Sequence, residues 1–271
     1  MTGKTSVVLS IAGSDSSAGA GIQADLKTFS ALGVYGATVI TAVTAQNTRG
    51  VTAVHLVPAE IVSAQIDAVF SDFSVGAVKT GMLGNADIVE AVASGLARWA
   101  GTIPFVFDPV MVSTSGTRLL EAEAEAAVLG LVPQATLITP NLHEAAVLLN
   151  TAVAQNENEA KEQVASLFAF GPGAVLIKGG HASGPYAADL FYDGSNFRSY
   201  SAPRIPAKNT HGTGCTLASA IAAYLVKGLP MEEAIAEAKA YLQGALERAG
   251  DLDIGSGPGP LPHFYRGLPR L

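Results

Sequence analysis

The chain has 271 residues, of which 49% are hydrophobic and 14% are charged, and its formal net charge is −7. This composition excludes a largely disordered chain and predicts one α/β unit with a large buried core, because such folds often reach this length as a single domain. The acidic balance and the absence of a basic cluster argue against nucleic acid or an anionic membrane surface as a partner.

The cysteine and histidine content bears on the compartment and on metal sites. A single cysteine, Cys215, excludes an internal disulfide, and the five histidines lie too far apart in sequence to indicate a metal site. The first residues carry no apolar segment followed by a cleavage site, and no apolar run reaches the ~20 residues that span a bilayer. We therefore expect a soluble, cytoplasmic protein.

Short apolar runs alternate with helical patterns along the chain. Most predicted strands are continuous apolar runs, which indicates burial on both faces, as in a parallel sheet. Two further runs, joined across Asp193-Gly194, predict a hairpin at a sheet edge. The predicted strands are Ser6–Ile11, Thr38–Val43, Val51–Val57, Gly76–Lys79, Phe105–Phe107, Thr136–Thr139 and Val175–Lys178, and the hairpin pairs Asp189–Tyr192 with Phe197–Ser201.

The helical patterns lie between these strands, with apolar residues recurring at helical spacing, as for Val62, Ile66 and Phe70. Helices are predicted over Ala20–Leu32, Asn85–Trp99, Glu121–Leu129 and Asn141–Leu149, and from about Pro58, Glu157, Thr213 and Met231. The alternation predicts a doubly wound, mostly parallel sheet with helices on both faces and a small edge hairpin. We expect one domain over residues 1–271, with 251–271 as a surface tail, because Gly255–Pro262 is rich in glycine and proline.

The loop from Asn209 to Thr216 leads directly into an unusually apolar segment, Leu217–Val226. It predicts a loop entering the N-terminus of a buried helix, where unpaired backbone N–H groups and the positive end of the helix dipole hold an anion. Cys215 lies at the start of that helix, a position that tends to lower a thiol pKa. The alternative is an ordinary glycine-rich turn beside a small buried cysteine.

The stretch from Gly19 to Ala24 formally matches a dinucleotide-binding fingerprint. Seven residues separate its first glycine from the preceding strand, and the next strand lacks the acidic residue expected for a ribose, so we reject a dehydrogenase. Asp15, Ala20 and Gly21 are instead candidates for a loop and helix N-terminus that approach a substrate. The alternative for Asp15 is an ordinary Asx-turn.

Polar residues follow several predicted strands, and ligands of open α/β sheets bind outside the carboxyl ends of strands. These places are Gln46, Thr80–Met82, Asp108–Met111, Asn141–Glu144 and Lys178–His181. Taken singly, each is also compatible with a helix cap or a solvated strand end. Together with the loop at Asn209–Thr216 they predict one rim of functional residues.

The motifs along this rim resemble a known family. The chain is similar to the hydroxymethylpyrimidine/phosphomethylpyrimidine kinases of thiamine biosynthesis, members of the ribokinase-like superfamily, in order over nearly its whole length. The resemblance implies phosphorylation of 4-amino-5-hydroxymethyl-2-methylpyrimidine and then of its monophosphate, with ATP and Mg²⁺, by a homodimer. The motifs are Ala12–Asp15, Gly19–Asp25, Thr44–Asn47, Gly81–Leu83, Asp108–Met111, Thr139–Leu142, Lys178–His181 and Asn209–Thr216.

Phosphoryl transfer needs charge neutralisation and alignment, which the resemblance assigns to several residues. The backbone N–H groups of Gly212, Thr213, Gly214 and Cys215 are expected to gather the charge of the transferring group. Lys178 is expected to meet the phosphates, with Thr210 and Asn141 also contacting ATP. Asp108 and Glu144 are expected at Mg²⁺, partly through water.

The pyrimidine is expected to meet Gln46, whose carboxamide offers one acceptor and a donor to the amino group and adjacent ring nitrogen. Met82 and Val110 are expected to supply apolar walls. Cys215 lies where sugar kinases of the superfamily carry an aspartate base, and is expected to accept the proton of the alcohol. Ala18, Thr80 and His143 depart from the usual family residues, which bears on substrate placement and not on the reaction class.

Three other functions remain open at this point. A pyridoxal-type kinase is the nearest, since its substrate is also a hydroxymethyl-substituted nitrogen heterocycle. A thiol hydrolase using Cys215 and His211 lacks an evident third partner. A binding or sensor protein without turnover is disfavoured by the acidic and basic residues Asp108, Glu144 and Lys178.

Overall fold

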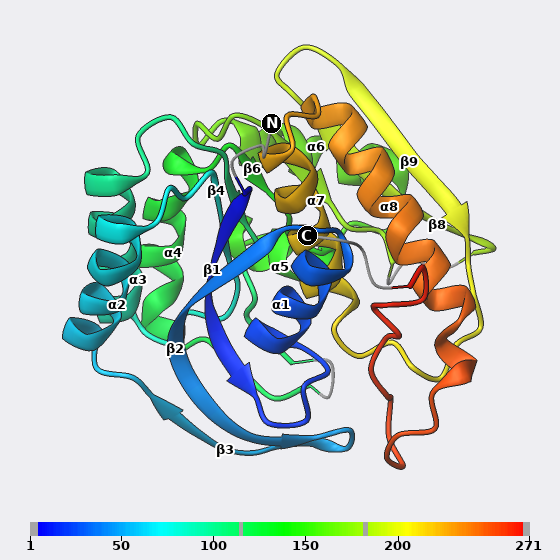
Figure 1. Ribbon diagram of the computed structural model, residues 1–271. Coiled ribbons are helices and arrows are strands. Elements are labelled where there is room, and N and C mark those ends of the chain that lie inside the picture. The colour runs from blue at the N-terminus through cyan, green and yellow to red at the C-terminus, as the bar shows by residue number, and fades with distance from the viewer. Residues whose placement is uncertain (1–4, 114–115, 181–183, 268–271) are drawn as a thin grey trace.

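We used a computed structural model, which describes residues 5–113, 116–180 and 184–267 (Figure 1). A nine-stranded sheet runs in the order β3-β2-β1-β4-β5-β6-β7-β8-β9, parallel from β2 to β7 and antiparallel at both edges. The strands are β1 (Val7–Asp15), β2 (Tyr35–Asn47), β3 (Gly50–Leu56), β4 (Ala77–Thr80), β5 (Phe105–Phe107), β6 (Leu137–Ile138), β7 (Val175–Ile177), β8 (Tyr186–Tyr192) and β9 (Phe197–Pro203).

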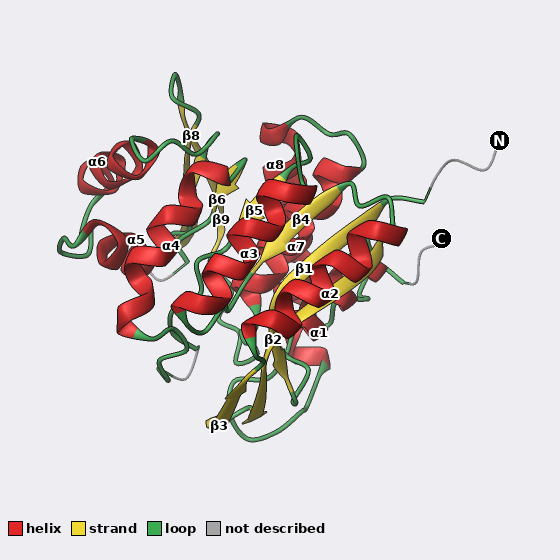
Figure 2. Ribbon diagram, turned by 90° about the vertical axis from the view of Figure 1, so that its left-hand side faces the viewer, coloured by secondary structure: helices red, strands yellow, loops and turns green. Residues whose placement is uncertain are grey.

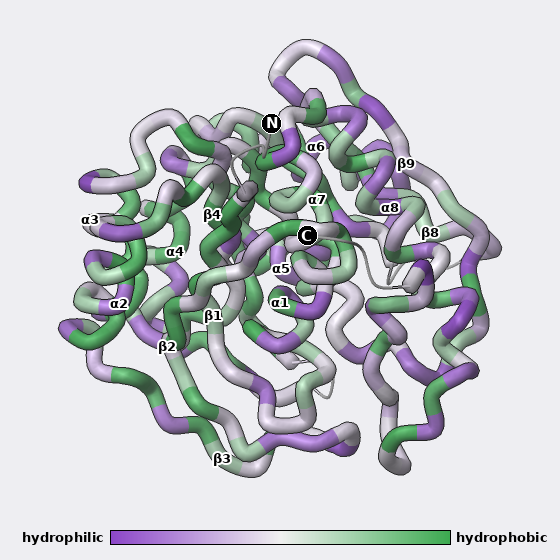
Figure 3. The backbone as a smooth tube through the Cα atoms, viewed as in Figure 1, coloured by the Kyte–Doolittle hydropathy of each residue, from purple (hydrophilic) through white to green (hydrophobic). Residues whose placement is uncertain are grey.

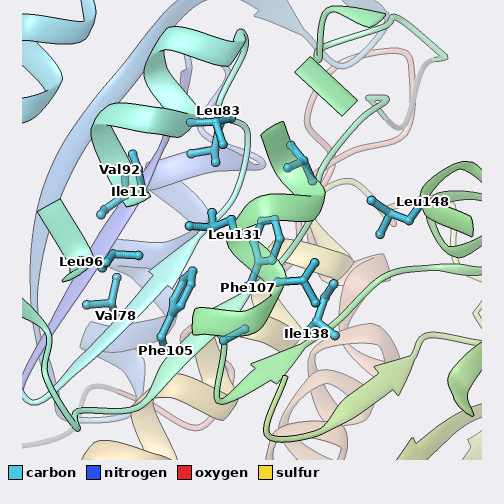
Figure 4. Close-up of a cluster of buried hydrophobic side chains, with 14 of the residues drawn as sticks. Ile11, Val78, Leu83, Val92, Leu96, Phe105, Phe107, Leu131, Ile138 and Leu148 are labelled. Atoms are coloured by element: carbon cyan, nitrogen blue, oxygen red, sulfur yellow. The ribbon is translucent and has the colours of Figure 1, made fainter. Parts of the chain in front are cut away.

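Helices cover both faces of the sheet, which confirms the predicted doubly wound α/β fold. One hydrophobic cluster packs the five helices from α2 through α6 against one face of the sheet (Figures 2 and 4). A second cluster packs α1, α7 and α8 against the other face. In Figure 3 hydrophobic colouring gathers around β4 in the interior, whereas β9 at the sheet edge is largely hydrophilic. The helices are α1 (Gly21–Ala31), α2 (Ala59–Asp72), α3 (Ala86–Trp99), α4 (Glu125–Leu131), α5 (Leu142–Leu149), α6 (Glu157–Phe168), α7 (Thr213–Val226) and α8 (Met231–Glu247).

The first two strands are longer than predicted. β1 continues through the expected loop to Asp15, and β2 continues to Asn47, so that Gln46 lies within a strand and not after one. The two strands pair in parallel as far as Asp15 and Thr44, with an irregularity between Ala12 and Ser14. Pairing with a neighbour outweighs the low strand propensity of Gly13, Ser14 and Asp15.

The sheet has a second antiparallel edge that the sequence interpretation missed. Val51–Val57 was interpreted as part of a buried parallel sheet, but β3 is an exposed edge strand that pairs antiparallel with β2. Only Thr48 and Arg49 separate the two strands, and a parallel connection needs a crossover of a dozen residues or more. The short loop therefore indicates a hairpin.

The helix predicted over Glu121–Leu129 is also different in detail. A 3₁₀ turn, Ala122–Ala124, precedes α4, which runs on to Leu131 and into a second 3₁₀ turn at Val132–Gln134. Proline at 133 suits the first turn of such a segment, because its missing N–H is not required there.

From Leu252 to Gly267, where the described part of the chain ends, there is no helix or strand, as the glycine and proline content predicts, but the description of 251–271 as a surface tail is wrong for part of it. Leu261 and His263 are buried, and the hydroxyl of Tyr241 on α8 donates to the carbonyl oxygen of His263. The segment therefore packs against α8. Across the described residues, the helices are too short or too polar to cross a membrane.

Candidate active site

A cavity of about 750 Å³ lies at the carboxyl ends of the parallel strands, beside the N-terminus of α7. Every residue that the sequence singled out for catalysis, substrate, cofactor or metal lines this cavity: Asp15, Ala20, Gly21, Gln46, Met82, Asp108, Val110, Asn141, Glu144, Lys178, Thr210, Gly212, Thr213, Gly214 and Cys215. His181, in one of the predicted motifs, lies outside the described residues. The strand order brings together motifs that are far apart in the sequence.

The N-terminus of α7 opens into this cavity. Gly212, its N-cap, has a φ of 82°, and a Cβ there would lie 2.0 Å from the carbonyl oxygen of Gly19. Only glycine suits that conformation and that close approach. The N–H of Thr213 donates to the carbonyl oxygen of Thr210 over a long 3.4 Å. The N–H groups of Gly214 and Cys215, which follow in the first turn, have no partner within the helix. The arrangement suits an anion.

Lys178 lies between two buried carboxylates at the floor of the cavity. Its Nζ is 2.5 Å from Asp108 Oδ1 and 3.7 Å from Glu144 Oε2. Burial lowers the pKa of Lys178, but these carboxylates outweigh it and raise the pKa overall. Burial and Asp108 raise the pKa of Glu144 to about 7 against the pull of Lys178. Lys178 therefore stays charged, whereas Glu144 is only partly ionised near neutral pH.

Asn141 serves as a helix cap as well as lining the cavity. Its side chain accepts from the backbone N–H of Glu144 at 2.9 Å, and Glu144 accepts from the backbone N–H of Asn141 at 2.7 Å. This is a capping box at the start of α5. The capping alternative raised from the sequence is therefore present, and it fixes Glu144 beside Lys178.

Asp15 organises the loop between β1 and α1. Its carboxylate accepts from the backbone N–H groups of Ser17, Gly19 and Ala20, and lies 2.8 Å from Nε2 of His211. Burial raises the pKa of Asp15, but these hydrogen bonds outweigh it and hold the pKa below its ordinary value. The Asx-turn alternative is thus present, and Asp15 ties the loop between β1 and α1 to the loop before α7.

The same two loops pack backbone to backbone. A Cβ on Gly19 would lie 2.3 Å from the His211 ring, so the ring needs glycine there. Ala18 holds a positive φ of 59°, a conformation that costs a non-glycine residue about 1–2 kcal/mol. That is the position where the resembling family usually has glycine.

Cys215 differs from expectation in its acidity. The helix N-terminus was expected to lower the thiol pKa, but burial raises it to about 11, against the favourable charge of Lys79. Asp25 and Asp108 raise the thiol pKa further, while a hydrogen bond with the backbone of Gly21 lowers it. The cost of burying a thiolate exceeds the stabilisation from one helix terminus. At neutral pH the free protein holds this cysteine as a thiol.

A buried ion pair lies below the cavity floor and was missed in the sequence. Lys79 Nζ is 2.9 Å and 3.0 Å from the two carboxylate oxygens of Asp25, and both side chains are fully buried. Asp25 also accepts from Ser10 and Ser219. The signal was available, because Asp25 falls on the apolar face of a predicted helix and Lys79 within a predicted buried strand.

Other cavity residues gave no clear sequence signal. An apolar group comes from α7, α8, the end of β9 and the loop after it: Leu217, Leu242, Leu246, Pro203 and Ile205. Of the two helices, α8 packs against β9, whereas α7 packs against β1, β4 and β5. Leucine at these helical positions is indistinguishable from core leucine in a single sequence.

Comparison with known proteins places the chain in a family. Residues 15–262 match the phosphomethylpyrimidine kinase family. A hydroxymethylpyrimidine/phosphomethylpyrimidine kinase of Rhizobium meliloti (strain 1021) is 57% identical over 97% of this chain and 98% of its own length.

Solved structures include a phosphomethylpyrimidine kinase from Clostridium difficile 630, with 42% identity, a TM-score of 0.78, and coverage of 88% of this chain and 98% of that one. They also include a pyridoxal kinase from Staphylococcus aureus in complex with ADP, with 34% identity, a TM-score of 0.89, and coverage of 97% and 95%. With a family match over most of its length, this chain belongs to the phosphomethylpyrimidine kinase family.

Proposed function

We propose that this chain transfers the γ-phosphoryl group of ATP to 4-amino-5-hydroxymethyl-2-methylpyrimidine and then to the resulting monophosphate, in thiamine biosynthesis. The observation that carries the proposal is the convergence of the α7 N-terminus and Lys178 on one cavity that also holds Gln46. Cations and backbone N–H groups at that point neutralise a transferring phosphoryl group, while the carboxamide reads a heterocycle. The names of the family and of its relatives support the same reaction.

The sheet order suggests how the two substrates lie. Gln46 belongs to β2, whereas the apolar group around Leu242 and Ile205 lies at the β8–β9 side, with Asp108 and Lys178 between them. The adenine would occupy the apolar end and the pyrimidine the end at Gln46, with Met82 and Val110 as walls. The triphosphate then spans the carboxyl ends of β5 to β7 and reaches the N-terminus of α7.

The acidic residues fit a Mg²⁺ ion bound together with the phosphates. Asp108 Oδ2 is buried and has no hydrogen-bond partner among the described residues, since Thr139 and Lys178 both bind Oδ1. The described residues form no cluster of three or more metal ligands, which suits Mg²⁺, because it commonly binds one or two carboxylates plus substrate phosphates. When bound, the ion neutralises charge on the phosphates. Asp108 and Glu144 would hold it.

The experiment that tests the function is phosphorus NMR of the products formed from the pyrimidine alcohol and ATP. We expect a monophosphate ester signal that is replaced by a diphosphate. Pyridoxal is the second substrate to compare, because several structural neighbours are pyridoxal kinases. A turnover of pyridoxal that exceeds turnover of the pyrimidine would overturn the proposed substrate, and no ATP consumption with either would favour a binding protein.

Replacing Gln46 with leucine is expected to raise KM for the pyrimidine at least about tenfold while leaving KM for ATP within about twofold. The substitution keeps the size of the side chain but removes the donor and acceptor that pair with the aminopyrimidine edge, and such a loss costs on the order of 1–3 kcal/mol. Steady-state kinetics with each substrate varied in turn measures both constants. Equal increases in the two would remove Gln46 from pyrimidine recognition.

Cys215→Ser is expected to slow the first phosphorylation more than the second. The alcohol must lose a proton, whereas the phosphate oxygen of the second acceptor is already ionised near neutral pH. Because the thiol pKa is about 11, the thiolate fraction rises throughout the accessible range. In the unaltered protein the first step should therefore gain about tenfold per pH unit from about pH 7 to about pH 9, and the second should not.

Rapid-quench assays of each step across this pH range separate the two rates. Equal losses in both steps of the Cys215→Ser variant, or a first step without pH dependence, would count against a base role for Cys215.

We also propose a single kinase domain that forms a homodimer in the cytoplasm. The β2–β3 hairpin projects from the sheet (Figure 2) and carries exposed apolar side chains at Val43 and Val54. An edge strand with unpaired N–H and C=O groups favours pairing with another chain. Sedimentation equilibrium would measure the assembly state, and a monomer at micromolar concentration would contradict the homodimer.

A further inference from the structure

The side chain of Gln46 takes part in a hydrogen-bond network that determines which way its amide points. At one end, the amide nitrogen is placed 3.2 Å from Nε2 of His211. At the other end, the amide oxygen is placed 3.1 Å from Oγ1 of Thr44. The nitrogen and oxygen of a carboxamide have nearly the same shape, so their assignment follows from the partners around them.

The contact with His211 conflicts with an amide nitrogen of Gln46 at that position. Nε2 of His211 also lies 2.8 Å from Asp15 Oδ2, and an ionised carboxylate only accepts hydrogen bonds. Nε2 must therefore carry a hydrogen, in the neutral as well as the protonated ring. The Gln46 nitrogen, which only donates, would then face another donor.

The contact with Thr44 conflicts independently with an amide oxygen of Gln46 at that position. The hydroxyl of Thr44 has one hydrogen, and it lies 2.9 Å from the carbonyl oxygen of Ser14 as well as 3.1 Å from the amide oxygen of Gln46. One hydrogen cannot serve both acceptors well.

Rotating the amide by half a turn resolves both conflicts at once. The amide oxygen then accepts from Nε2–H of His211, which is shared with Asp15 as a three-centre hydrogen bond. The amide nitrogen donates to Thr44, whose own hydrogen goes to Ser14. The backbone of Gln46 is fixed in addition, since its N–H donates to Ser16 Oγ and its carbonyl accepts from the same hydroxyl.

We propose that Thr44 and His211 are positioning residues that hold the Gln46 amide with its oxygen towards His211 and its nitrogen towards Thr44, so that the site selects amino over oxo pyrimidines. The proposal rests on the proposed function. One N–H of the amide and one lone pair of its oxygen remain to face the cavity that Gln46 lines. They pair with a ring nitrogen and its adjacent amino group.

An oxo pyrimidine presents the opposite pattern, with a ring N–H beside a carbonyl oxygen. Against a fixed amide this places donor against donor and acceptor against acceptor, which leaves buried polar groups unpaired. A site built to pair with a substrate group discriminates strongly against an analogue that cannot do so. An amide free to rotate would accommodate both analogues, so the selectivity depends on the two neighbours that fix it.

The orientation itself is measured by NMR on the substrate-free protein. We expect nuclear Overhauser contacts from the Gln46 amide hydrogens to the methyl group of Thr44, with the resonances assigned by their loss in Gln46→Leu. Contacts from these hydrogens to the His211 ring in place of the Thr44 methyl would overturn the proposal. This readout needs no turnover, so it is independent of the proposed function.

The selectivity is measured as the ratio of kcat/KM for the aminopyrimidine to kcat/KM for its 4-oxo analogue. Thr44→Val removes the hydroxyl at nearly constant volume and is expected to lower this ratio at least about tenfold. Thr44→Ser, which keeps the hydroxyl, is the matched control and should retain the ratio. An unchanged ratio in Thr44→Val overturns the proposal, whereas failure of the unaltered protein to phosphorylate the aminopyrimidine overturns the proposed function instead.

Discussion

Lys178→Met is expected to lower kcat about 10³-fold with a smaller change in KM for the pyrimidine. The ammonium group lies in the cavity beside Asp108 and Glu144, close to the N-terminus of α7, where a Cβ on Gly214 would be 3.4 Å from Nζ. A preorganised charge at the site where transition-state charge develops contributes about 3–4 kcal/mol, and about 1.4 kcal/mol changes a rate tenfold.

The expected loss concerns the chemical step, so its controls must separate catalysis from folding. Lys161→Met makes the same substitution in an exposed lysine that also pairs with a carboxylate, Glu157 at 2.7 Å, and should leave kcat unchanged. Lys178→Arg keeps the charge in a planar group of different geometry, so its kcat should lie between those of Lys178→Met and Lys161→Met. A kcat within tenfold of the unaltered protein in Lys178→Met, with normal unfolding behaviour, would contradict a role for Lys178 in phosphoryl transfer.

That the candidate site residues share one cavity was predictable, because their positions depend on the sheet. Once buried strands were assigned to a parallel sheet, their carboxyl ends had to share one edge, which brings Gln46, Asp108 and Lys178 together. The glycines at 212 and 214 indicated a close approach before a helix, and α7 begins at Thr213. These inferences rest on spacing and on backbone requirements, which a sequence displays directly.

The acidity of Cys215 was not predictable in the same way. A helix N-terminus is visible in the sequence, but the depth of burial and the neighbours from β4, α1 and β5 are not. Desolvation, Asp25 and Asp108 all raise the thiol pKa, and the opposing charge of Lys79 does not offset them. Similarly, β3 was misplaced because burial on both faces and exposure at an edge give similar apolar runs.

The pairing of Asp25 with Lys79 shows an intermediate case, in which the sequence contains a signal that only the fold explains. Two opposite charges in predicted buried elements imply a partner for each, since an isolated buried charge is prohibitively costly. The structure adds that the pair joins α1 to β4 and, through Ser10 and Ser219, to β1 and α7. These elements include the helix that follows the Asp15 loop and α7, whose N-terminus opens into the cavity.

Lys79→Met is accordingly expected to destabilise the protein by about 3–5 kcal/mol. Burial lowers the pKa of Lys79, but the charges of Asp25 and Asp108 and the hydrogen bond to Asp25 outweigh it and raise the pKa, so the lysine is charged in the folded state. Removing it leaves the Asp25 carboxylate buried without a cation, and breaking a buried pair from one side costs about this much. Urea unfolding followed by circular dichroism measures the change.

The double variant Lys79→Met/Asp25→Asn decides whether the unpaired charge is the cause. Asparagine is neutral, and it can still bond both serines, because its oxygen accepts from one hydroxyl and its nitrogen donates to the other. The double variant should therefore recover at least half of the lost stability. If the loss came from poor packing of methionine among its neighbours, the double variant would be no more stable than Lys79→Met. Recovery would instead show that each charge of the pair is needed mainly to neutralise the other. It would also show that hydrogen bonds at position 25 hold the four elements together as much as the charge of Asp25 does.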